Sequence, residues 1–202
     1  MANVLILFAH PALEKSRVHK RLLAQIPAGT EVRLHDLYEH YPNFDIDIAY
    51  EQQLLLQHDI IVFQHPLYWY SSPAIIKQWQ DLVLEHGWAY GSKGTALLGK
   101  KWLQVISSGG SAEAYKETGR NKFPLTQYLL PFRQTAALCG MEFLPPFVVH
   151  GTHRLNDADI ELHALQYEQL LFALRQNRIS EDELKGVQYI NEIIPIPNAI
   201  QS

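Results

Sequence analysis

The sequence predicts an α/β protein of one domain, built on a doubly wound parallel sheet with helices on both faces. Short apolar runs alternate with longer amphipathic stretches along most of the chain. This alternation is typical of parallel strands that are buried on both sides by helices. The length of 202 residues suits one domain, and a hydrophobic content of 47% is enough for one substantial core.

The first unit is a strand at residues 4–9 followed by a helix at residues 17–26. The run from Val4 to Ala9 is apolar throughout, as expected of a strand with both faces buried. In the helix, apolar residues recur at helical spacing, and Pro27 ends the pattern. A short second strand is predicted at residues 31–35.

The third strand, at residues 60–64, precedes the clearest helix in the sequence. Pro73 fits the first helical position, and an apolar stripe then runs from Ile75 to Val83. Gly87 lies just past the end of this helix, where glycine is common.

The remaining elements repeat the same alternation. We predict a fourth strand at residues 101–108, a helix at residues 123–138 that is interrupted near Pro131, a fifth strand at residues 143–150 and a last helix at residues 157–176. Five strands in this order suit a flavodoxin-like doubly wound fold with strand order 2-1-3-4-5. Residues 1–176 would form this domain, and the apolar tail 177–202 would pack on the domain or on a partner.

Composition and charge exclude several classes of protein. A formal charge of −4 without a basic cluster argues against a nucleic-acid-binding surface. The single cysteine, Cys139, cannot form an internal disulfide, and we expect it to be buried. No apolar run reaches the length of about 18 residues that a membrane helix needs. We therefore expect a cytoplasmic protein.

The first of three unusual loops leads from the first strand into the first helix. Ligands bind open parallel sheets beyond the carboxyl ends of the strands, where the strand order switches. A helix N-terminus there suits a phosphate, with Ser16 as a hydroxyl donor and with His10 and Arg17 adding charge. Alternatively, Ser16 is only a helix cap and His10 only a loop residue. The glycine pattern of a dinucleotide-binding domain is absent from this loop.

The second loop, residues 64–73, follows the third strand and contains three aromatic residues, Tyr68, Trp69 and Tyr70. A planar ring ligand would explain this cluster, and backbone amides from Leu67 to Tyr70 would bond the polar edge of the ring. The alternative is a hydrophobic contact between subunits, and both interpretations can hold together.

The third loop is Ser107-Ser-Gly-Gly-Ser111, with Tyr115 close behind. Consecutive glycines allow the backbone to approach a ligand closely, although a flexible turn would also use them. The loop lacks the G-x-S-x-G pattern of a hydrolase nucleophile. His150 and His153 have the spacing of metal ligands but no third partner, so we expect no metal site.

At these three loops the chain resembles the NAD(P)H:quinone oxidoreductase family of flavodoxin-like flavoproteins. The resemblance covers roughly residues 3–175. It is carried by Ala9-His-Pro with Ser16, by Phe63-Gln-His-Pro-Leu-Tyr-Trp-Tyr70 with Pro73-Ala-Ile-Ile-Lys-Gln-Trp79, and by Ser107-Ser-Gly-Gly-Ser111 with Tyr115. Residues 40–48 and 94–100 resemble the bacterial branch that includes ancillary subunits of glutathione-gated potassium efflux systems.

The resemblance implies an enzyme of the NAD(P)H dehydrogenase (quinone) type. It implies a homodimer that binds FMN, or alternatively FAD, and passes hydride from NAD(P)H to quinones or related electrophilic acceptors in a ping-pong cycle. The cofactor-binding residues would be His10, Ser16, Arg17, Val18, Pro66, Leu67, Tyr68, Trp69, Tyr70, Ser107, Ser108, Gly109, Gly110 and Tyr115.

Three positions depart from the family pattern. Tyr115 would act in hydride transfer, but Asn121 occupies the position of the histidine that vertebrate members pair with this tyrosine. Asn121 can donate a hydrogen bond but cannot take a proton near neutral pH. His19 stands where members often carry asparagine, and Tyr68 stands where they carry glutamine.

Three other functions remain to be weighed against this one. In the first alternative, the chain is a regulatory subunit of a potassium efflux system. It would then lie at the inner membrane through its partner, and its flavin would be structural or sensory. An electron carrier like flavodoxin fits poorly, because such carriers are strongly acidic and monomeric. A hydrolase lacks a recognisable nucleophile.

Overall fold

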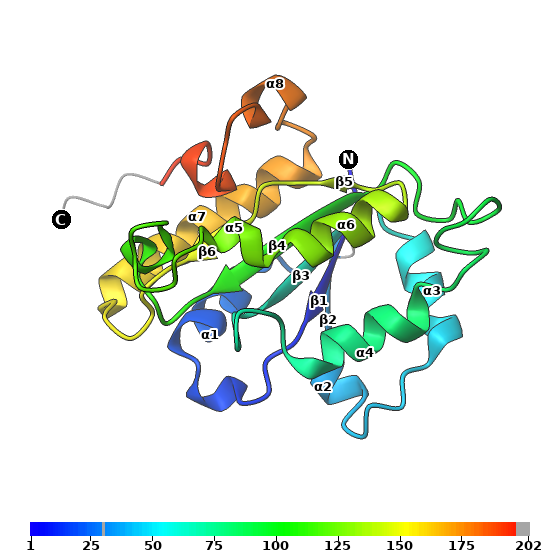
Figure 1. The fold of residues 1–202 in the computed structure, drawn as a ribbon, viewed down its shortest axis with the longest axis horizontal. Helices are drawn as coiled ribbons and strands as arrows, with labels where there is room; N and C mark the ends of the chain where they lie inside the picture. Colours follow the sequence, from blue (N-terminus) through cyan, green and yellow to red (C-terminus); the bar gives the residue numbers. More distant parts are fainter. Residues whose placement is uncertain (30, 197–202) are drawn as a thin grey trace.

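The computed structural model describes residues 1–29 and 31–196, and its centre is a parallel sheet (Figure 1). The strands lie in the order β2-β1-β3-β4-β5, with β6 also paired to β4. This order confirms the predicted flavodoxin-like topology. The strands are β1 Val4–Phe8, β2 Val32–Asp36, β3 Ile60–Pro66, β4 Lys101–Ser107, β5 Glu142–Phe143 and β6 Phe147–Val149.

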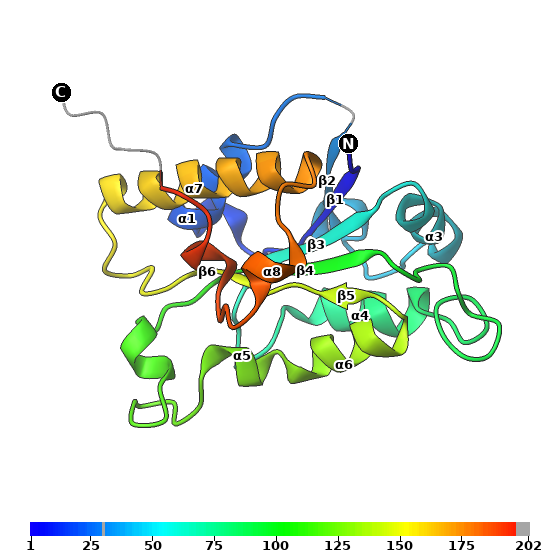
Figure 2. The same cartoon turned by 90° about the horizontal axis from the view of Figure 1, so that it is seen from above.

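Helices cover both faces of the sheet, as Figure 2 shows from above. Helices α1 and α7 cover one face, and α4, α5 and α6 cover the other. The helices are α1 Arg17–Ala24, α2 Leu37–His40, α3 Ile48–Leu56, α4 Ala74–Val83, α5 Leu125–Tyr128, α6 Leu130–Leu138, α7 Asp157–Arg175 and α8 Glu181–Leu184. Short 3-10 helices occur at Leu13–Lys15, Ala112–Tyr115 and Ile190–Glu192.

Successive residues of a strand point to opposite faces, so the sheet divides the apolar residues between two cores. In β1, Leu5 and Leu7 enter the core under α3, α4 and α6, whereas Val4, Ile6 and Phe8 enter the core under α1 and α7. All five side chains are fully buried. This explains why β1 is apolar throughout rather than alternating.

Several element boundaries differ from the predictions; for example, α1 ends at Ala24 rather than at residue 26. The predicted fifth strand is two strands, β5 and β6, because Pro145 and Pro146 interrupt the pairing with β4. Pro73 is the N-cap of α4 rather than its first helical residue. The predicted interruption near Pro131 is confirmed: α5 and α6 are separated at Leu129, because proline suits the first turn of the new helix α6.

Helices α2 and α3 were not predicted from the pattern. Helix α2 has four residues and begins at Asp36, whose carboxylate accepts from the Tyr38 and Glu39 N–H groups. Helix α3 is apolar on several sides, so it has no clear stripe, but Asp47 caps it through the Tyr50 N–H group. Both starts use an N-cap that is visible in the sequence.

The C-terminal segment packs on the edge of the sheet at β6. The Asn191 side chain pairs with both backbone groups of Val148, accepting from its N–H at 2.8 Å and donating to its oxygen at 3.3 Å. The Gln166 amide, from α7, donates to the Asn191 and Ile194 oxygens at 2.8 Å each. These contacts satisfy an exposed strand edge and favour packing on the domain. The end of the apolar run, Pro197, lies outside the described residues.

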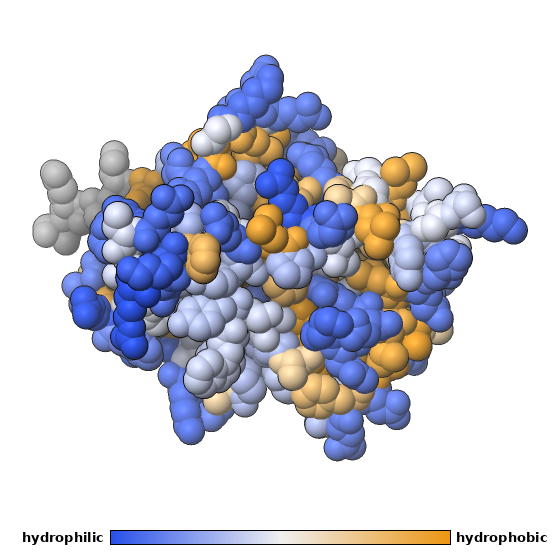
Figure 3. All heavy atoms as spheres, in the orientation of Figure 1, coloured by the Kyte–Doolittle hydropathy of each residue, from blue (hydrophilic) through white to orange (hydrophobic). Residues whose placement is uncertain are grey.

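Hydrophilic residues predominate on the face seen in Figure 3, and hydrophobic residues gather there in small groups. Within residues 1–29 and 31–196, no helix combines the length and the apolar character that crossing a membrane requires. Cys139 is buried at the end of α6, as predicted.

Candidate active site

The carboxyl ends of β1, β3 and β4 lie side by side and border two adjoining cavities. Pro66 at the end of β3 pairs in register with Ser107 at the end of β4. The cavities have volumes of about 320 and about 570 Å³. Both are lined by Leu67, Gly109 and His153, so they form one continuous depression. This is the switch point between β1 and β3, where the fold class predicts a ligand site.

The first cavity lies at the N-terminus of α1. Ser16 caps this helix, and its hydroxyl oxygen accepts from the His19 N–H group at 3.1 Å. The cap interpretation of Ser16 is therefore correct, and Ser16 also lines the cavity. The Arg17 and Val18 N–H groups belong to the first turn, where no helical acceptor exists. They remain available to an anion, and the helix dipole favours one.

Arg17 does not direct its charge into the cavity as the sequence suggested. Its guanidinium donates to the Asp157 carboxylate at 2.7 Å and to the Leu155 oxygen at 3.0 Å. The charge of Arg17 is therefore largely balanced by Asp157, at the start of α7. Lys15 lines the same cavity and supplies the cation that the sequence interpretation assigned to Arg17.

His10 also lines the first cavity. Its Nδ1 atom accepts from the Ala12 N–H group at 3.1 Å, so in the neutral ring the proton is on Nε2. Partial burial lowers the pKa of His10. His10 is thus a neutral hydrogen-bond donor near neutral pH rather than a fixed charge.

The aromatic loop forms one wall of the second cavity. Tyr68 and Ser71 exchange two backbone hydrogen bonds of 2.9 Å, which leaves Trp69 and Tyr70 as the two central residues of a tight turn. Trp69 is 94% exposed, and it lines the cavity with Tyr70. An exposed aromatic pair at a cavity mouth suits a planar ligand.

The prediction for the amides of residues 67–70 needs a correction. The Leu67 N–H group donates to the Ser107 oxygen at 2.8 Å, and the Tyr68 N–H group is used inside the turn. These two donors hold the loop in place and are not free for a ligand. Among the described residues, only the Trp69 and Tyr70 amides of this segment are without a backbone partner.

The two glycines lie close to aromatic side chains. A Cβ atom at Gly109 would lie 2.8 Å from the His153 Nε2 atom, and one at Gly110 would lie 2.9 Å from the Tyr115 Cε2 atom. His153 is exposed and can move aside, whereas Tyr115 is buried, so a side chain at Gly110 would displace a packed ring. The flexible-turn interpretation is therefore insufficient at Gly110.

Tyr115 and Asn121, the two predicted catalytic residues, both line the second cavity. Tyr115 is only 8% exposed, and burial raises the pKa of its hydroxyl. It therefore stays protonated at neutral pH and can donate. The Asn121 Oδ1 atom accepts from the Tyr70 hydroxyl at 3.5 Å, so Asn121 connects the aromatic loop to the segment that follows Tyr115.

The structure brings residues to the site that sequence reasoning missed. Thr152, His153 and Arg154 come from the loop after β6, and Lys15 and Arg120 complete the lining. For His153 the sequence pattern indicates only the spacing of a metal ligand. Its position after the last strand was the available signal, because that loop lies at the same edge of the sheet as the other three.

The lining of the two cavities is cationic. Besides Arg17, whose charge Asp157 balances, the lining contains Lys15, Arg120 and Arg154, and its described residues include no aspartate or glutamate. The whole chain, by contrast, has a formal charge of −4. This local reversal of charge suits an anionic ligand.

A family model described as a flavodoxin-like fold matches residues 2–171. The chain belongs to this flavodoxin-like family. A glutathione-regulated potassium-efflux system ancillary protein KefG from Yersinia enterocolitica is 46% identical over 169 residues, which cover 84% of this chain and 92% of KefG. YrkL from Bacillus subtilis, which is named as an uncharacterized NAD(P)H oxidoreductase, is 47% identical over 159 residues, which cover 79% of this chain and 91% of YrkL.

Solved structures give the same assignment. General stress protein 14 from Treponema denticola, in complex with FMN, is 40% identical with a TM-score of 0.81, and covers 85% of this chain and 99% of its own. An NADPH-quinone reductase from P. pentosaceus is 34% identical with a TM-score of 0.76, and covers 83% of this chain and 96% of its own. The family suggested by the three loops is therefore confirmed.

Proposed function

We propose that this protein is an FMN-dependent NAD(P)H:quinone oxidoreductase. The observation that carries the proposal is the joined pair of cavities. One part has a helix N-terminus and cations suited to a phosphate, and the other has aromatic and glycine walls suited to a flat ring. The names of the relative YrkL and of the P. pentosaceus structure support the activity, and the FMN complex supports the cofactor.

The residues present fit FMN. Ser16, the Val18 N–H group and the His10 Nε2–H group would hold the phosphate, and Lys15 would balance its charge. When bound, FMN would supply the two-electron chemistry by which hydride passes from NAD(P)H to a quinone or related electrophilic acceptor in a ping-pong cycle. The alternative cofactor is FAD, and the experiment below distinguishes the two.

The second cavity would hold the ring and the two substrates in turn. The Gly109 and Gly110 N–H groups are without backbone acceptors in the described structure, so they can bind a polar ring edge that gains negative charge. Trp69 and Tyr70 would cover the stacked substrates and exclude water. The Tyr115 hydroxyl, kept protonated by burial, would donate toward the reacting edge.

The test is a visible spectrum of the protein after saturation with FMN or FAD and removal of the excess. We expect FMN to remain bound, to bleach on anaerobic addition of NADPH and to recover on addition of a quinone. The Tyr115→Phe variant should retain FMN and lose rate, by ~10-fold or more for a lost charge-stabilising donor. Protein that retains no flavin would contradict the proposal, and unchanged turnover in the variant would remove Tyr115 from it.

Exposed apolar side chains support a homodimer. Trp69 is almost fully exposed, and Phe123 and Leu130 are each about half exposed (52% and 53%). A second copy of the chain would cover such apolar groups and close the cavity. Sedimentation of the wild type and of the Trp69→Glu variant tests this: we expect a dimer that the added charge weakens.

A second candidate function is regulation of a potassium efflux transporter. The observation that favours it is the 46% identity to the ancillary protein KefG over 84% of the chain. In that role the protein would lie at the inner membrane through its partner. We expect deletion of the gene to lower glutathione-regulated potassium efflux, and unchanged efflux would exclude this role while leaving the oxidoreductase activity open.

A further inference from the structure

Four buried polar side chains form a continuous chain from helix α7 to the first cavity. The Tyr167 hydroxyl lies 2.8 Å from the Gln64 Oε1 atom. The Gln64 Nε2 atom lies 3.4 Å from the His19 Nδ1 atom, and the His19 Nε2 atom lies 2.9 Å from the Ser107 Oγ atom. Tyr167, Gln64 and His19 are fully buried, and Ser107 lines the first cavity.

The orientation of the Gln64 amide sets the direction of each proton. The Tyr167 hydroxyl donates to the Gln64 carbonyl oxygen, so in this orientation the Gln64 amide nitrogen faces His19 and can only donate. The His19 Nδ1 atom then accepts. Burial, together with the neighbouring His10 and His65, lowers the pKa of His19 well below its usual value, so the ring is neutral. In a neutral ring that accepts at Nδ1, the proton is on Nε2.

This protonation state of His19 determines the orientation of the Ser107 hydroxyl. A protonated Nε2 donates to the Ser107 oxygen, so the hydroxyl hydrogen of Ser107 cannot point back toward His19. The described residues supply no acceptor for it elsewhere, and Ser107 lines the same cavity as His10 and Ser16. A hydroxyl is free to donate or to accept, whereas this one is held as a donor that faces the cavity.

We propose that the chain from Tyr167 through Gln64 and His19 holds the Ser107 hydroxyl as a donor to the phosphate of the bound flavin nucleotide. His19 is then a positioning residue that acts through Ser107. This inference rests on the proposed FMN site and adds to it a source of selectivity. A phosphate can only accept hydrogen bonds near neutral pH, so a fixed donor favours FMN over riboflavin, which lacks the phosphate.

The experiment compares the Kd of FMN with that of riboflavin, each measured by quenching of flavin fluorescence. We expect Ser107→Ala and His19→Leu each to weaken FMN by ~10-fold or more, the scale of a hydrogen bond to a charged group, and to change riboflavin by less than ~2-fold. The double variant should be no weaker than either single variant, because both remove the same bond. His19→Gln, which keeps an N–H donor, should restore part of the affinity.

A second, milder variant distinguishes a specific loss of FMN binding from misfolding. Tyr167→Phe keeps the packing and removes only the hydroxyl that orients Gln64, so we expect a smaller loss confined to FMN. Nitrogen NMR of His19 in the flavin-free protein should show the neutral ring protonated at Nε2. A ring protonated at Nδ1, additive losses in the double variant, or equal losses for FMN and riboflavin would each overturn the inference.

These outcomes are distinguishable from failure of the proposed function. Wild-type protein that binds neither FMN nor riboflavin would overturn both the FMN site and the role of His19. Wild-type protein that binds FMN tightly, with an unchanged FMN-to-riboflavin ratio in His19→Leu and Tyr167→Phe, would overturn only the role of His19.

Discussion

Glu51 is a fully buried carboxylate in helix α3, and it accepts three hydrogen bonds. Its donors are the His35 Nε2 atom at 2.6 Å, the Tyr41 hydroxyl at 2.6 Å and the Trp79 Nε1 atom at 2.8 Å. Burial alone would raise the pKa of Glu51, but these three donors lower it below its usual value. Glu51 is therefore held as a charged carboxylate inside the core.

The Glu51→Gln variant should be less stable at about pH 7 by ~2–4 kcal/mol, because an amide group cannot accept from all three donors. The folded-state pKa of Glu51 is lowered, so its contribution is present above the unfolded-state pKa. It is lost as the pH falls through the lower folded-state value. The stability difference between wild type and variant should therefore shrink in acid, as urea unfolding at several pH values can measure.

The control is Glu168→Gln, on the exposed side of α7. This variant should lose less than ~0.5 kcal/mol, as is usual for surface substitutions. A difference between wild type and Glu51→Gln that stays constant from neutral pH into acid would contradict the charged state assigned to Glu51.

At the scale of elements, the turn at the end of β3 places two aromatic residues in a backbone conformation that aromatic residues rarely adopt. Trp69 and Tyr70 have φ values of 47° and 63°, in the left-handed region. Two-residue turns with both central φ values positive normally use Asn-Gly or Asp-Gly, because a side chain costs about 1–2 kcal/mol there. Strain that persists beside a cavity suggests that these aromatic rings are held for binding.

We expect the Trp69→Asn variant to be more stable than wild type, by up to ~1 kcal/mol without flavin, since asparagine tolerates this conformation and Trp69 loses almost no packing. The same variant should show slower turnover, because the second cavity loses part of its cover. Unfolding in urea and steady-state kinetics measure the two effects on one sample.

Phe123→Asn is the matched control for this prediction. Phe123 is also exposed, but its φ value is not positive, so its replacement should relieve no strain. A Trp69→Asn variant that is less stable than wild type would show that the turn is not strained by its aromatic residues.

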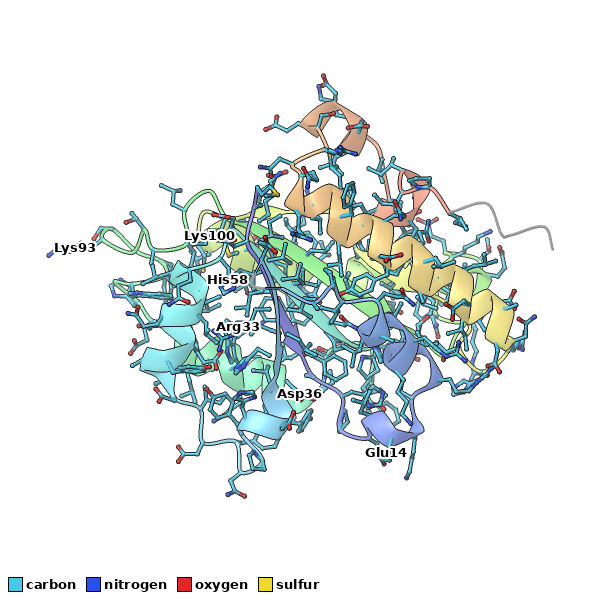
Figure 4. All side chains as sticks on the ribbon, turned by 180° about the vertical axis from the view of Figure 1, so that it is seen from behind. Glu14, Arg33, Asp36, His58, Lys93 and Lys100 are labelled. Atoms are coloured by element: carbon cyan, nitrogen blue, oxygen red, sulfur yellow. The ribbon has the colours of Figure 1, made fainter. Side chains whose placement is uncertain are left out.

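At the scale of the whole molecule, charge is distributed unevenly. The chain is acidic overall, yet Arg120 and Arg154 border the second cavity and form no ion pair among the described residues. Lys93 and Lys100 lie elsewhere: Lys93 is at the tip of a loop at the far end of the molecule from α7, and Lys100 contacts the His58 oxygen (Figure 4). A focused positive field of this kind attracts anionic substrates.

We expect the double variant Arg120→Gln, Arg154→Gln to raise the KM for NADPH by roughly 3–10-fold at low salt, with little change in FMN affinity. The effect should shrink as salt rises, because exposed charges are screened over about 10 Å at 0.1 M and about 3 Å at 1 M. Lys93→Gln removes a charge far from the site and should leave the KM unchanged. A KM effect that is independent of salt would instead indicate direct contact with the substrate.

Much of the fold follows from patterns that lie close together in the chain. The apolar runs of β1, β3 and β4 and the stripe of α4 are local, and their alternation is enough to predict the layers and the strand order. The loops after β1, β3 and β4 were predicted as the site for the same reason, since the carboxyl ends of parallel strands meet at one edge. These features depend on residue type and spacing alone.

Tertiary structure decided what depends on residues far apart in sequence. Glu51 looks like any helix carboxylate until the fold surrounds it with donors from three other segments. In the sequence Arg17 resembles a phosphate ligand, but in the fold α7 brings Asp157 to it. In the sequence His19 is only a replacement for the asparagine of the family, but in the fold Gln64 and Ser107 contact its two nitrogen atoms. Sequence pattern determines which faces are apolar, whereas hydrogen bonding and charge pairing depend on distances and directions that only the packed chain sets.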